Sequence, residues 1–154
     1  MGDNLSEPIA IERGVRQGCP ASPTLFNIFI NDILDKTMNI GVLVPGMAQR
    51  TQGLLYADDL VLLVESPEEL HAALDRVHDC AAKWEMGFGI DICKVSVYFG
   101  DVEALRARKF TLGPHEVGVD FKYRYLGISV DSQWSIKRVI DEQYNVSRTA
   151  LMAA

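Results

Sequence analysis

The chain has 154 residues, of which 48% are hydrophobic, and its formal net charge is −6. This length fits one ordinary domain with a real core, and the apolar content excludes a disordered chain. The charge makes the whole chain a poor autonomous nucleic-acid binder, but residues 105–154 carry eight basic against five acidic side chains. Contact with a polyanion is therefore expected mainly in that part.

The cysteines and the absence of long apolar runs indicate a cellular compartment. Cys19, Cys80 and Cys93 are odd in number, widely spaced and without a CxxC pair, which argues against a disulfide framework or a zinc site. We expect Cys80 to be a small buried hydrophobe. No run of 18 uncharged apolar residues occurs, and the N-terminus lacks a basic start followed by an apolar stretch. We therefore expect an intracellular protein, cytoplasmic or nuclear, that does not enter a membrane.

The first expected element is a helix that follows a loop. Residues 14–23, GVRQGCPASP, are rich in Gly and Pro and predict the loop. Ser22 followed by Pro23 predicts the helix start, with the Ser22 hydroxyl as cap and proline at the first helical position. Apolar residues at helical spacing continue over residues 25–34, and the helix should end before Gly41.

A β-hairpin is expected next. Residues 52–56 and 60–64 are short apolar runs on either side of Ala57-Asp58-Asp59, a pattern typical of two paired strands. The second run, LVLLV, is apolar at every position. We therefore expect it to be buried on both faces.

A second helix should follow the hairpin. Residues 66–69, SPEE, form a capping box with proline at the first helical position. Apolar residues at helical spacing lead to Trp84, which we expect in the core, and Gly87 and Gly89 should end the helix. His71 and His78 have no ligand spacing and should lie on the solvated face.

The rest of the chain predicts short strands and a last helix. Residues 90–99 have strand character, with a change of phase at Cys93-Lys94 that predicts a bulge or turn. Residues 109–113, 117–121 and 123–130 predict further strands, and 133–152 predict a helix that runs on without a cap, as in a truncated chain. The order of elements predicts an α+β fold, an antiparallel sheet with helices packed on one face.

The adjacent acids Asp58 and Asp59 have two interpretations. Aspartate is common in tight turns, where its carboxylate caps backbone N–H groups. Two adjacent like charges between apolar strands are also costly near low dielectric, and a divalent cation would compensate them. Carboxylate oxygens are the ligands that Mg²⁺ prefers.

Four segments resemble motifs of one enzyme family. Residues 56–59, YADD, resemble the YxDD signature of reverse transcriptases. Residues 16–26, RQGCPASPTLF, resemble the motif with which that family contacts template and nucleotide. Residues 87–100 resemble the next palm motif, and residues 123–127, YRYLG, the primer-grip hairpin. Their order and spacing match the reverse transcriptases of non-LTR (LINE-like) retrotransposons, and the resemblance covers roughly residues 10–150.

The resemblance implies an architecture and a reaction. Residues 1–130 would form a partial polymerase palm, without fingers and without the first aspartate motif, and residues 131–154 would begin a thumb helix. The chemistry would be in-line attack of a primer 3′-hydroxyl on the α-phosphate of a dNTP, with Mg²⁺ or Mn²⁺ as cofactor. The partners would be an RNA template and a DNA primer.

The resemblance also implies roles for single residues. Asp58 would ligate the catalytic metal with Asp59 as its partner, and Lys94 would protonate the leaving pyrophosphate. Tyr56 would line the nucleotide site beside the primer end. The other implied residues contact template or nucleotide (Arg16, Gln17 and Gly18) or steady the primer (Tyr125, Leu126 and Gly127).

Each of these roles has a structural alternative. Arg16 could be a solvated loop arginine, and Gln17-Gly18 could simply form a tight turn. Lys94 could be an exposed lysine at a strand end. Tyr125 and Leu126 could equally be core residues.

The chain departs from the family in its acidic ligands. The family's metal site also takes an aspartate from an earlier strand, whereas only Asp3 precedes Arg16 here, in no matching context. We therefore expect a partial RNA-directed DNA polymerase domain that is weak or inactive as an isolated chain. The alternative is a non-catalytic retroelement-derived protein that binds a second copy or another protein through exposed palm surfaces.

Overall fold

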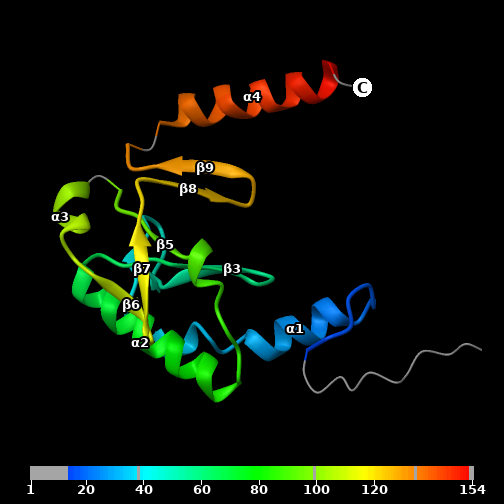
Figure 1. Ribbon diagram of the computed structural model, residues 1–154, viewed down its shortest axis with the longest axis vertical. Helices are drawn as coiled ribbons and strands as arrows, with labels where there is room; N and C mark the ends of the chain where they lie inside the picture. The colour runs from blue at the N-terminus through cyan, green and yellow to red at the C-terminus, as the bar shows by residue number, and fades with distance from the viewer. Residues whose placement is uncertain (1–13, 38, 99, 134, 153–154) are drawn as a thin grey trace, which may run out of the picture.

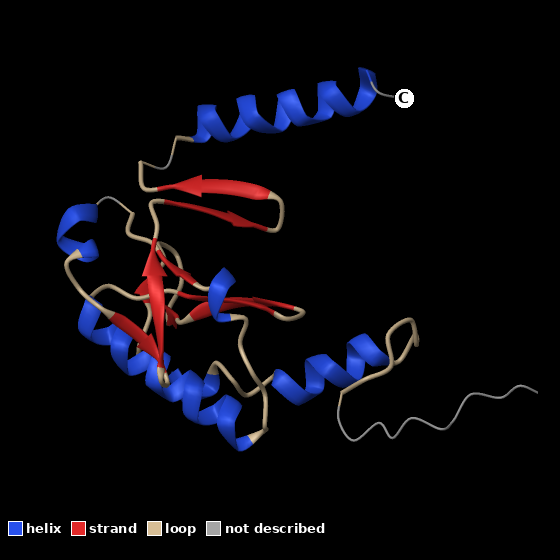
Figure 2. Ribbon diagram, viewed as in Figure 1, coloured by secondary structure: helices blue, strands red, loops and turns tan. Residues whose placement is uncertain are grey.

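The computed structural model describes residues 14–37, 39–98, 100–133 and 135–152, and within them the fold is mixed α+β, as predicted. Figures 1 and 2 show the strands between α2 on one side and α4 on the other. The helices are α1 Ser22–Ile30, α2 Pro67–Lys83, α3 Val102–Arg106 and α4 Ile136–Met152, with 3₁₀ turns at Asp35–Thr37 and Ile90–Ile92. The strands are β1 Val42–Leu43, β2 Arg50–Thr51, β3 Gly53–Tyr56, β4 Asp59–Leu62, β5 Lys94–Val95, β6 Phe110–Leu112, β7 His115–Val119, β8 Lys122–Tyr125 and β9 Ile128–Asp131.

The strands of the described ranges form four small sheets instead of the expected single antiparallel sheet. Three are two-stranded antiparallel pairs, β1–β2, β3–β4 and β8–β9. The fourth has the order β5-β7-β6, and β5 runs parallel to β7. The physical reason is the length of the strands, because β5 keeps only two residues after the preceding Ile90–Ile92 segment curls into a 3₁₀ turn. Alternation predicts a strand but not its partner.

Most predicted elements occur with shifted ends. The hairpin pairs Tyr56 with Asp59 and Gly53 with Leu62. The segment 123–130 was expected as one strand, but a turn at Leu126-Gly127 divides it into β8 and β9. Both turn residues have positive φ, 48° and 81°, as a type I′ hairpin turn requires. The predicted strand 90–99 is a 3₁₀ turn followed by β5, and Phe99 lies outside the described residues.

The core lies where α2 packs on β6. Leu74 of α2 is buried with Val95, Phe110, Leu112 and Val117 from the three-stranded sheet. A second cluster joins Val77 and Cys80 of α2 to Ile33, so the predicted burial of Cys80 is confirmed. The Ser66 cap is also confirmed, because its hydroxyl accepts a hydrogen bond from the Glu69 N–H at 3.1 Å, whereas the Glu69 carboxylate accepts from the Glu65 N–H at 3.0 Å.

Three expectations about burial are wrong. Trp84 is 41% exposed because it caps the end of α2, where its ring meets Phe29 edge-on at 5.3 Å. His71 and His78 are half-buried, and the His71 ring stacks on Phe110 at 5.0 Å. The run 60–64 is half-buried, since β4 has β3 as its one partner strand in the described sheets.

The last helix packs on the β8–β9 hairpin. Glu142 of α4 accepts a hydrogen bond from the Ser129 hydroxyl at 3.0 Å, and Arg138 pairs with Asp131 at 2.6 Å. None of the helices in the described ranges has both the length and the apolar character that a bilayer crossing requires.

Candidate active site

The loop before α1 is folded back on the start of that helix. The backbone carbonyl of Arg16 accepts hydrogen bonds from the Cys19 N–H at 3.3 Å and from the Ser22 hydroxyl at 2.6 Å. Gly18 has φ +81°, which favours glycine at this bend. Ser22 was expected to cap α1, but the helix begins at Ser22 itself and its N-cap is Ala21, without a side-chain hydrogen bond. The Ser22 hydroxyl serves the loop instead.

The β3–β4 hairpin presents the two acids. Its two-residue turn is Ala57-Asp58, and Ala57 adopts the left-handed conformation with φ +50°. Asp58 and Asp59 are both exposed, which corrects the expectation that they lie in a buried environment. Asp58 lies in the turn and Asp59 is the first residue of β4, so both stand at the exposed end of the hairpin, where water screens their repulsion and no compensating charge is required.

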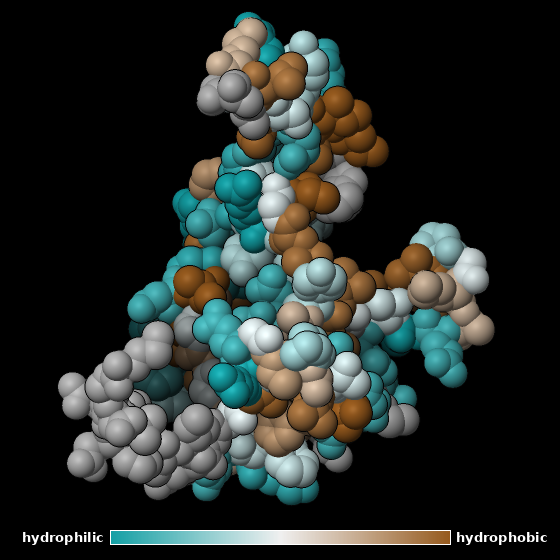
Figure 3. Space-filling view, turned by 90° about the vertical axis from the view of Figure 1, so that its right-hand side faces the viewer, coloured by the Kyte–Doolittle hydropathy of each residue, from teal (hydrophilic) through white to brown (hydrophobic). Residues whose placement is uncertain are grey.

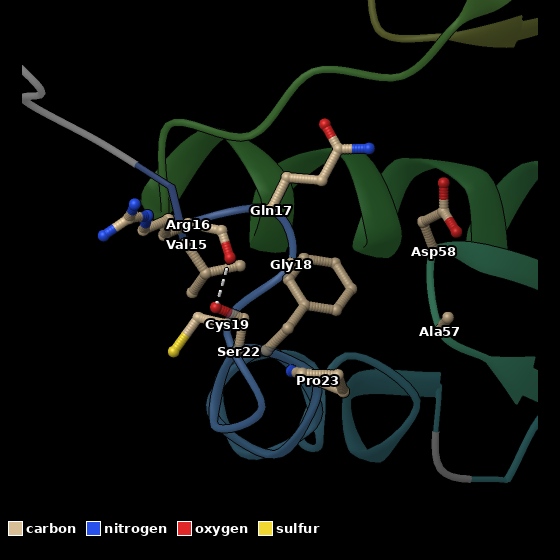
Figure 4. Close-up of a pocket in the computed structure, with 10 residues that line it drawn as sticks. Val15, Arg16, Gln17, Gly18, Cys19, Ser22, Pro23, Ala57 and Asp58 are labelled. Atoms are coloured by element: carbon tan, nitrogen blue, oxygen red, sulfur yellow. Dashed lines mark hydrogen bonds between the residues drawn. The ribbon is translucent and has the colours of Figure 1, made fainter.

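Loop and hairpin meet at one open pocket of about 640 Å³. Figure 4 shows the labelled residues of the loop and of the α1 start on one side, and Ala57 and Asp58 at the tip of the hairpin on the other. Two segments that lie about 40 residues apart in the sequence therefore line the same pocket. The lining residues are Val15, Arg16, Gln17, Gly18, Cys19, Ser22, Pro23, Phe26, Ala57 and Asp58.

Cys19 is a lining residue that the sequence analysis did not single out. Its thiol pKa is lowered, chiefly by a hydrogen bond from the Ala21 backbone. Burial raises the pKa of the Cys93 thiol, and Cys80 is buried in the core. Cys19 therefore has more thiolate character near neutral pH than Cys93. In the sequence, only its position between Gly18 and the start of the helix could have indicated that Cys19 lies in the site.

The other predicted site residues do not line this pocket. Tyr56 is 64% exposed on β3, opposite Asp59. Lys94 is exposed on β5, and its ammonium group lies over Gly118 of β7. Tyr125 is half-buried, so the core alternative for its side chain holds in part, whereas Leu126 is exposed.

The predicted primer-grip residues form the end of a separate hairpin. The Gly127 carbonyl accepts a hydrogen bond from the Gln143 amide of α4 at 2.9 Å. Tyr123 begins the same predicted motif and feels the charge of one of the acids. Its pKa is raised, chiefly by burial and then by the charge of Asp59. The β8–β9 hairpin and the acidic hairpin thus lie within electrostatic reach of each other.

The acids fit a divalent cation in kind but make an incomplete set. Carboxylate oxygens suit Mg²⁺, which a protein usually holds through one or two carboxylates while phosphates and water complete the octahedron. A two-metal centre needs acids from more than one place on the scaffold. No group of three His, Cys, Asp or Glu residues is placed to hold a metal within the described residues. Asp3 lies outside those residues.

Comparison with known proteins agrees with the motifs. The pattern of the family described as reverse transcriptase (RNA-dependent DNA polymerase) matches residues 1–130. A Pol polyprotein of the type-1 retrotransposable element R2 from Nasonia vitripennis is 35% identical over 81% of this chain and 13% of its own length. The RNA-directed DNA polymerase of the mobile element jockey from Drosophila funebris is 28% identical over 92% of this chain and 15% of its own length.

A third relative, the Pol polyprotein of the type-2 retrotransposable element R2DM from Drosophila melanogaster, is 32% identical over 80% of this chain and 12% of its own length. The chain thus spans less than a sixth of the length of these relatives. The four motifs, the family match and the relatives agree with one another. The chain belongs to the reverse transcriptase family, in its non-LTR, LINE-like branch.

Proposed function

We propose that this chain carries the metal- and nucleotide-facing part of an RNA-directed DNA polymerase. The supporting observation is the shared pocket, which Arg16, Gln17 and Gly18 of the loop line together with Asp58. Asp58, with Asp59 as its partner, would hold Mg²⁺ or Mn²⁺, and a cation there would stabilise the charge of a triphosphate. The family generally uses a divalent metal, and the donor chemistry of the two aspartates agrees with that.

The chain's own residues would bind and orient the reactants. Gly18, which has no Cβ, allows a nucleotide to approach the loop backbone closely. The Arg16 guanidinium would pair with a phosphate, and Gln17 would contact template or nucleotide. Tyr56 would stand beside the primer end, and Lys94 would give a proton to the leaving pyrophosphate. An RNA template, a DNA primer and a dNTP are the proposed partners.

The remaining elements would steady the primer. Tyr125, Leu126 and Gly127 are the proposed grip, because their hairpin lies within electrostatic reach of Asp59. We assign residues 1–130 to a polymerase palm and 131–154 to the start of a thumb. This division follows the end of the family match at residue 130, and α4 lies wholly in the second part.

The number of acids at the end of the hairpin, Asp58 and Asp59, determines the activity that we expect. Two aspartates can bind one cation, but they do not align two ions and a triphosphate without a further acid. We therefore expect metal-dependent dNTP binding by this chain, and little or no extension of a primer on an RNA template.

The test is titration of a dNTP in Mg²⁺ or Mn²⁺ by calorimetry, combined with a primer-extension assay. Asp58→Asn should weaken binding at least about tenfold, a change of about 1.4 kcal/mol. The matched control is Asp75→Asn, which removes an exposed acid of α2 outside the pocket. Equal affinities of wild type and Asp58→Asn would refute the proposed role of the pocket.

A second candidate function is a non-catalytic interaction protein, and α4 favours it. Its apolar residues Ile136, Ile140, Tyr144 and Leu151 recur on one side of the helix, and each is at least 61% exposed. Figure 3 shows hydrophobic surface at the level of α4. Such a stripe normally meets another surface. Sedimentation at high concentration tests self-association, and Ile140→Glu should abolish it, whereas a monomer at every concentration would count against this form of the second function.

A further inference from the structure

The chain contains two Ser-Pro pairs, and each stands at the start of a helix. Ser66 of the pair Ser66-Pro67 is the N-cap of α2, and its hydroxyl accepts a hydrogen bond from the Glu69 N–H. Ser22 of the pair Ser22-Pro23 is already inside α1, and its hydroxyl donates to the Arg16 carbonyl six residues earlier. The same dipeptide therefore holds a helix end in one place and a loop in the other.

The surroundings of Ser22 show that it is a fixed point for a loop that is otherwise at the surface. Its residue is 8% exposed, whereas residues 14–18 are all exposed. Two backbone hydrogen bonds also link Arg16 to Ser22. The Cys19 N–H donates to the Arg16 carbonyl at 3.3 Å, and the Ser22 N–H donates to the Cys19 carbonyl at 3.1 Å. The Gly18 bend lies inside the ring that these bonds close. At Gly18 no atom lies within 4 Å of the position that a Cβ would take.

We propose that Ser22 is a positioning residue, whose hydroxyl holds the Arg16 carbonyl so that Gln17 and Gly18 face Asp58 across the pocket. This inference rests on the proposed function of that pocket. Ser22 contacts neither nucleotide nor metal in this account. It acts through the backbone of Arg16, and the hydrogen bond is the shortest of those that close the loop.

The consequence of losing the hydroxyl follows from the geometry. In Ser22→Ala the two backbone bonds remain but the 2.6 Å bond is lost, so the loop should open more often. A single neutral hydrogen bond corresponds to about a five- to tenfold change in such an equilibrium. Ser22→Thr keeps the hydroxyl and should restore the closed loop.

Two readouts separate this proposal from the proposed function. The first is limited trypsin cleavage after Arg16, which needs no ligand and reports how often the loop opens, because cleavage of a folded chain follows the population of the open form. Cleavage after Arg108 in the same digest is the internal reference. The second readout is the dissociation constant of a dNTP in Mn²⁺.

Ser22→Ala should speed cleavage after Arg16 about five- to tenfold relative to Arg108 and weaken dNTP binding by a similar factor, and Ser22→Thr should reverse both changes. The control Ser66→Ala should lower the melting temperature without either change. Unchanged cleavage after Arg16 in Ser22→Ala overturns the proposal. It is also overturned if Ser66→Ala changes cleavage after Arg16 and dNTP binding as much as Ser22→Ala does. If Ser22→Ala is cleaved faster after Arg16 but the wild-type chain binds no dNTP, the role of Ser22 in holding the loop is supported and the proposed function is overturned.

Discussion

The two hairpins of the molecule, β3–β4 and β8–β9, have similar ends and different supports. In each, a tyrosine precedes a two-residue turn whose first residue is left-handed, Ala57 with φ +50° and Leu126 with φ +48°. The β8–β9 turn is bound from outside, by the Gln143 amide of α4. The β3–β4 turn faces the open pocket, and its strands pack through Leu55, Leu60 and Leu62 on the core cluster that contains Val77 and Cys80.

This difference shows how the β3–β4 hairpin can keep Asp58 and Asp59 exposed at its turn while its strands are held in the fold. A hairpin that is anchored at its base by packing leaves its tip free for a ligand. The β8–β9 hairpin instead has its turn bound by α4 (Figure 1), at the end that we propose as the primer grip. The left-handed Ala57 is strained by about 1–2 kcal/mol relative to ordinary backbone, and such strain is characteristic of functional sites.

The largest effect should come from the base of the β3–β4 hairpin. In Gly53→Ala the new Cβ would overlap the carbonyl oxygen of Val61 and approach the Leu34 side chain at 3.2 Å. We expect a loss of about 3 kcal/mol in the free energy of unfolding, measured in urea. Gly127→Ala is the matched change in the other hairpin. It meets no atom within 4 Å and should cost about 1–2 kcal/mol through its φ of +81°. Equal losses would remove the distinction between the two supports.

Asp58→Asn should change function and leave stability alone. The side chain is exposed at the tip of the hairpin, so the free energy of unfolding should stay within about 0.5 kcal/mol of wild type. Binding of a dNTP in Mn²⁺ should weaken at least about tenfold. If Asp58→Asn unfolds the chain as readily as Gly53→Ala, the tip carries structure and the account of a free tip is wrong.

The alternation that predicts the hairpins could not predict these supports. Residues 52–64 identify two strands and a polar turn, and the structure pairs Tyr56 with Asp59 accordingly. The pocket could be anticipated only through the motif order, because its walls come from residues 15–26 and 57–58. Exposure of Asp58 and Asp59 was missed, since the apolar flanks describe the strands and not the tip. The role of Ser22 was missed because a Ser-Pro pair is read as a cap.

The division into small sheets could not be predicted from the sequence for a related reason. A two-residue strand such as β5 has no period, and its parallel pairing with β7 depends on a contact with a residue 24 positions later, Lys94 with Gly118. The core was predictable where a helical stripe exists, as at Leu74 and Val77. Trp84 ends that stripe, and the helix cap places it at the surface.

Smaller effects should come from the turn residues. Ala57→Gly relieves the left-handed strain but adds freedom to the unfolded chain, so a gain of about 0.5 kcal/mol is expected. Leu126→Gly should give a similar gain, because its φ is nearly the same. Thermal unfolding measures both. A loss of more than about 1 kcal/mol in either variant would show that the side chain, and not the backbone, fixes that turn.

An effect of the same small size should come from the contact between α4 and the second hairpin. Gln143→Ala removes the amide that donates to the Gly127 carbonyl and should cost about 0.5 kcal/mol, because the bond is exposed to water. Amide hydrogen exchange at residues 125–128 should rise more than exchange at residues 56–59. Equal increases in the two turns would contradict separate supports.

The most direct measurement is the rate at which an alkylating reagent labels Cys19, read by mass spectrometry with and without a dNTP and Mn²⁺. Cys19 lines the same pocket as Asp58, and its lowered pKa makes it react at lower pH than Cys93, whose pKa burial raises. If loop and hairpin form one site, the metal and nucleotide together slow labelling of Cys19 in wild type and in Asp75→Asn, but not in Asp58→Asn. Equal labelling rates with and without nucleotide, or equal protection in Asp58→Asn, would contradict a single site.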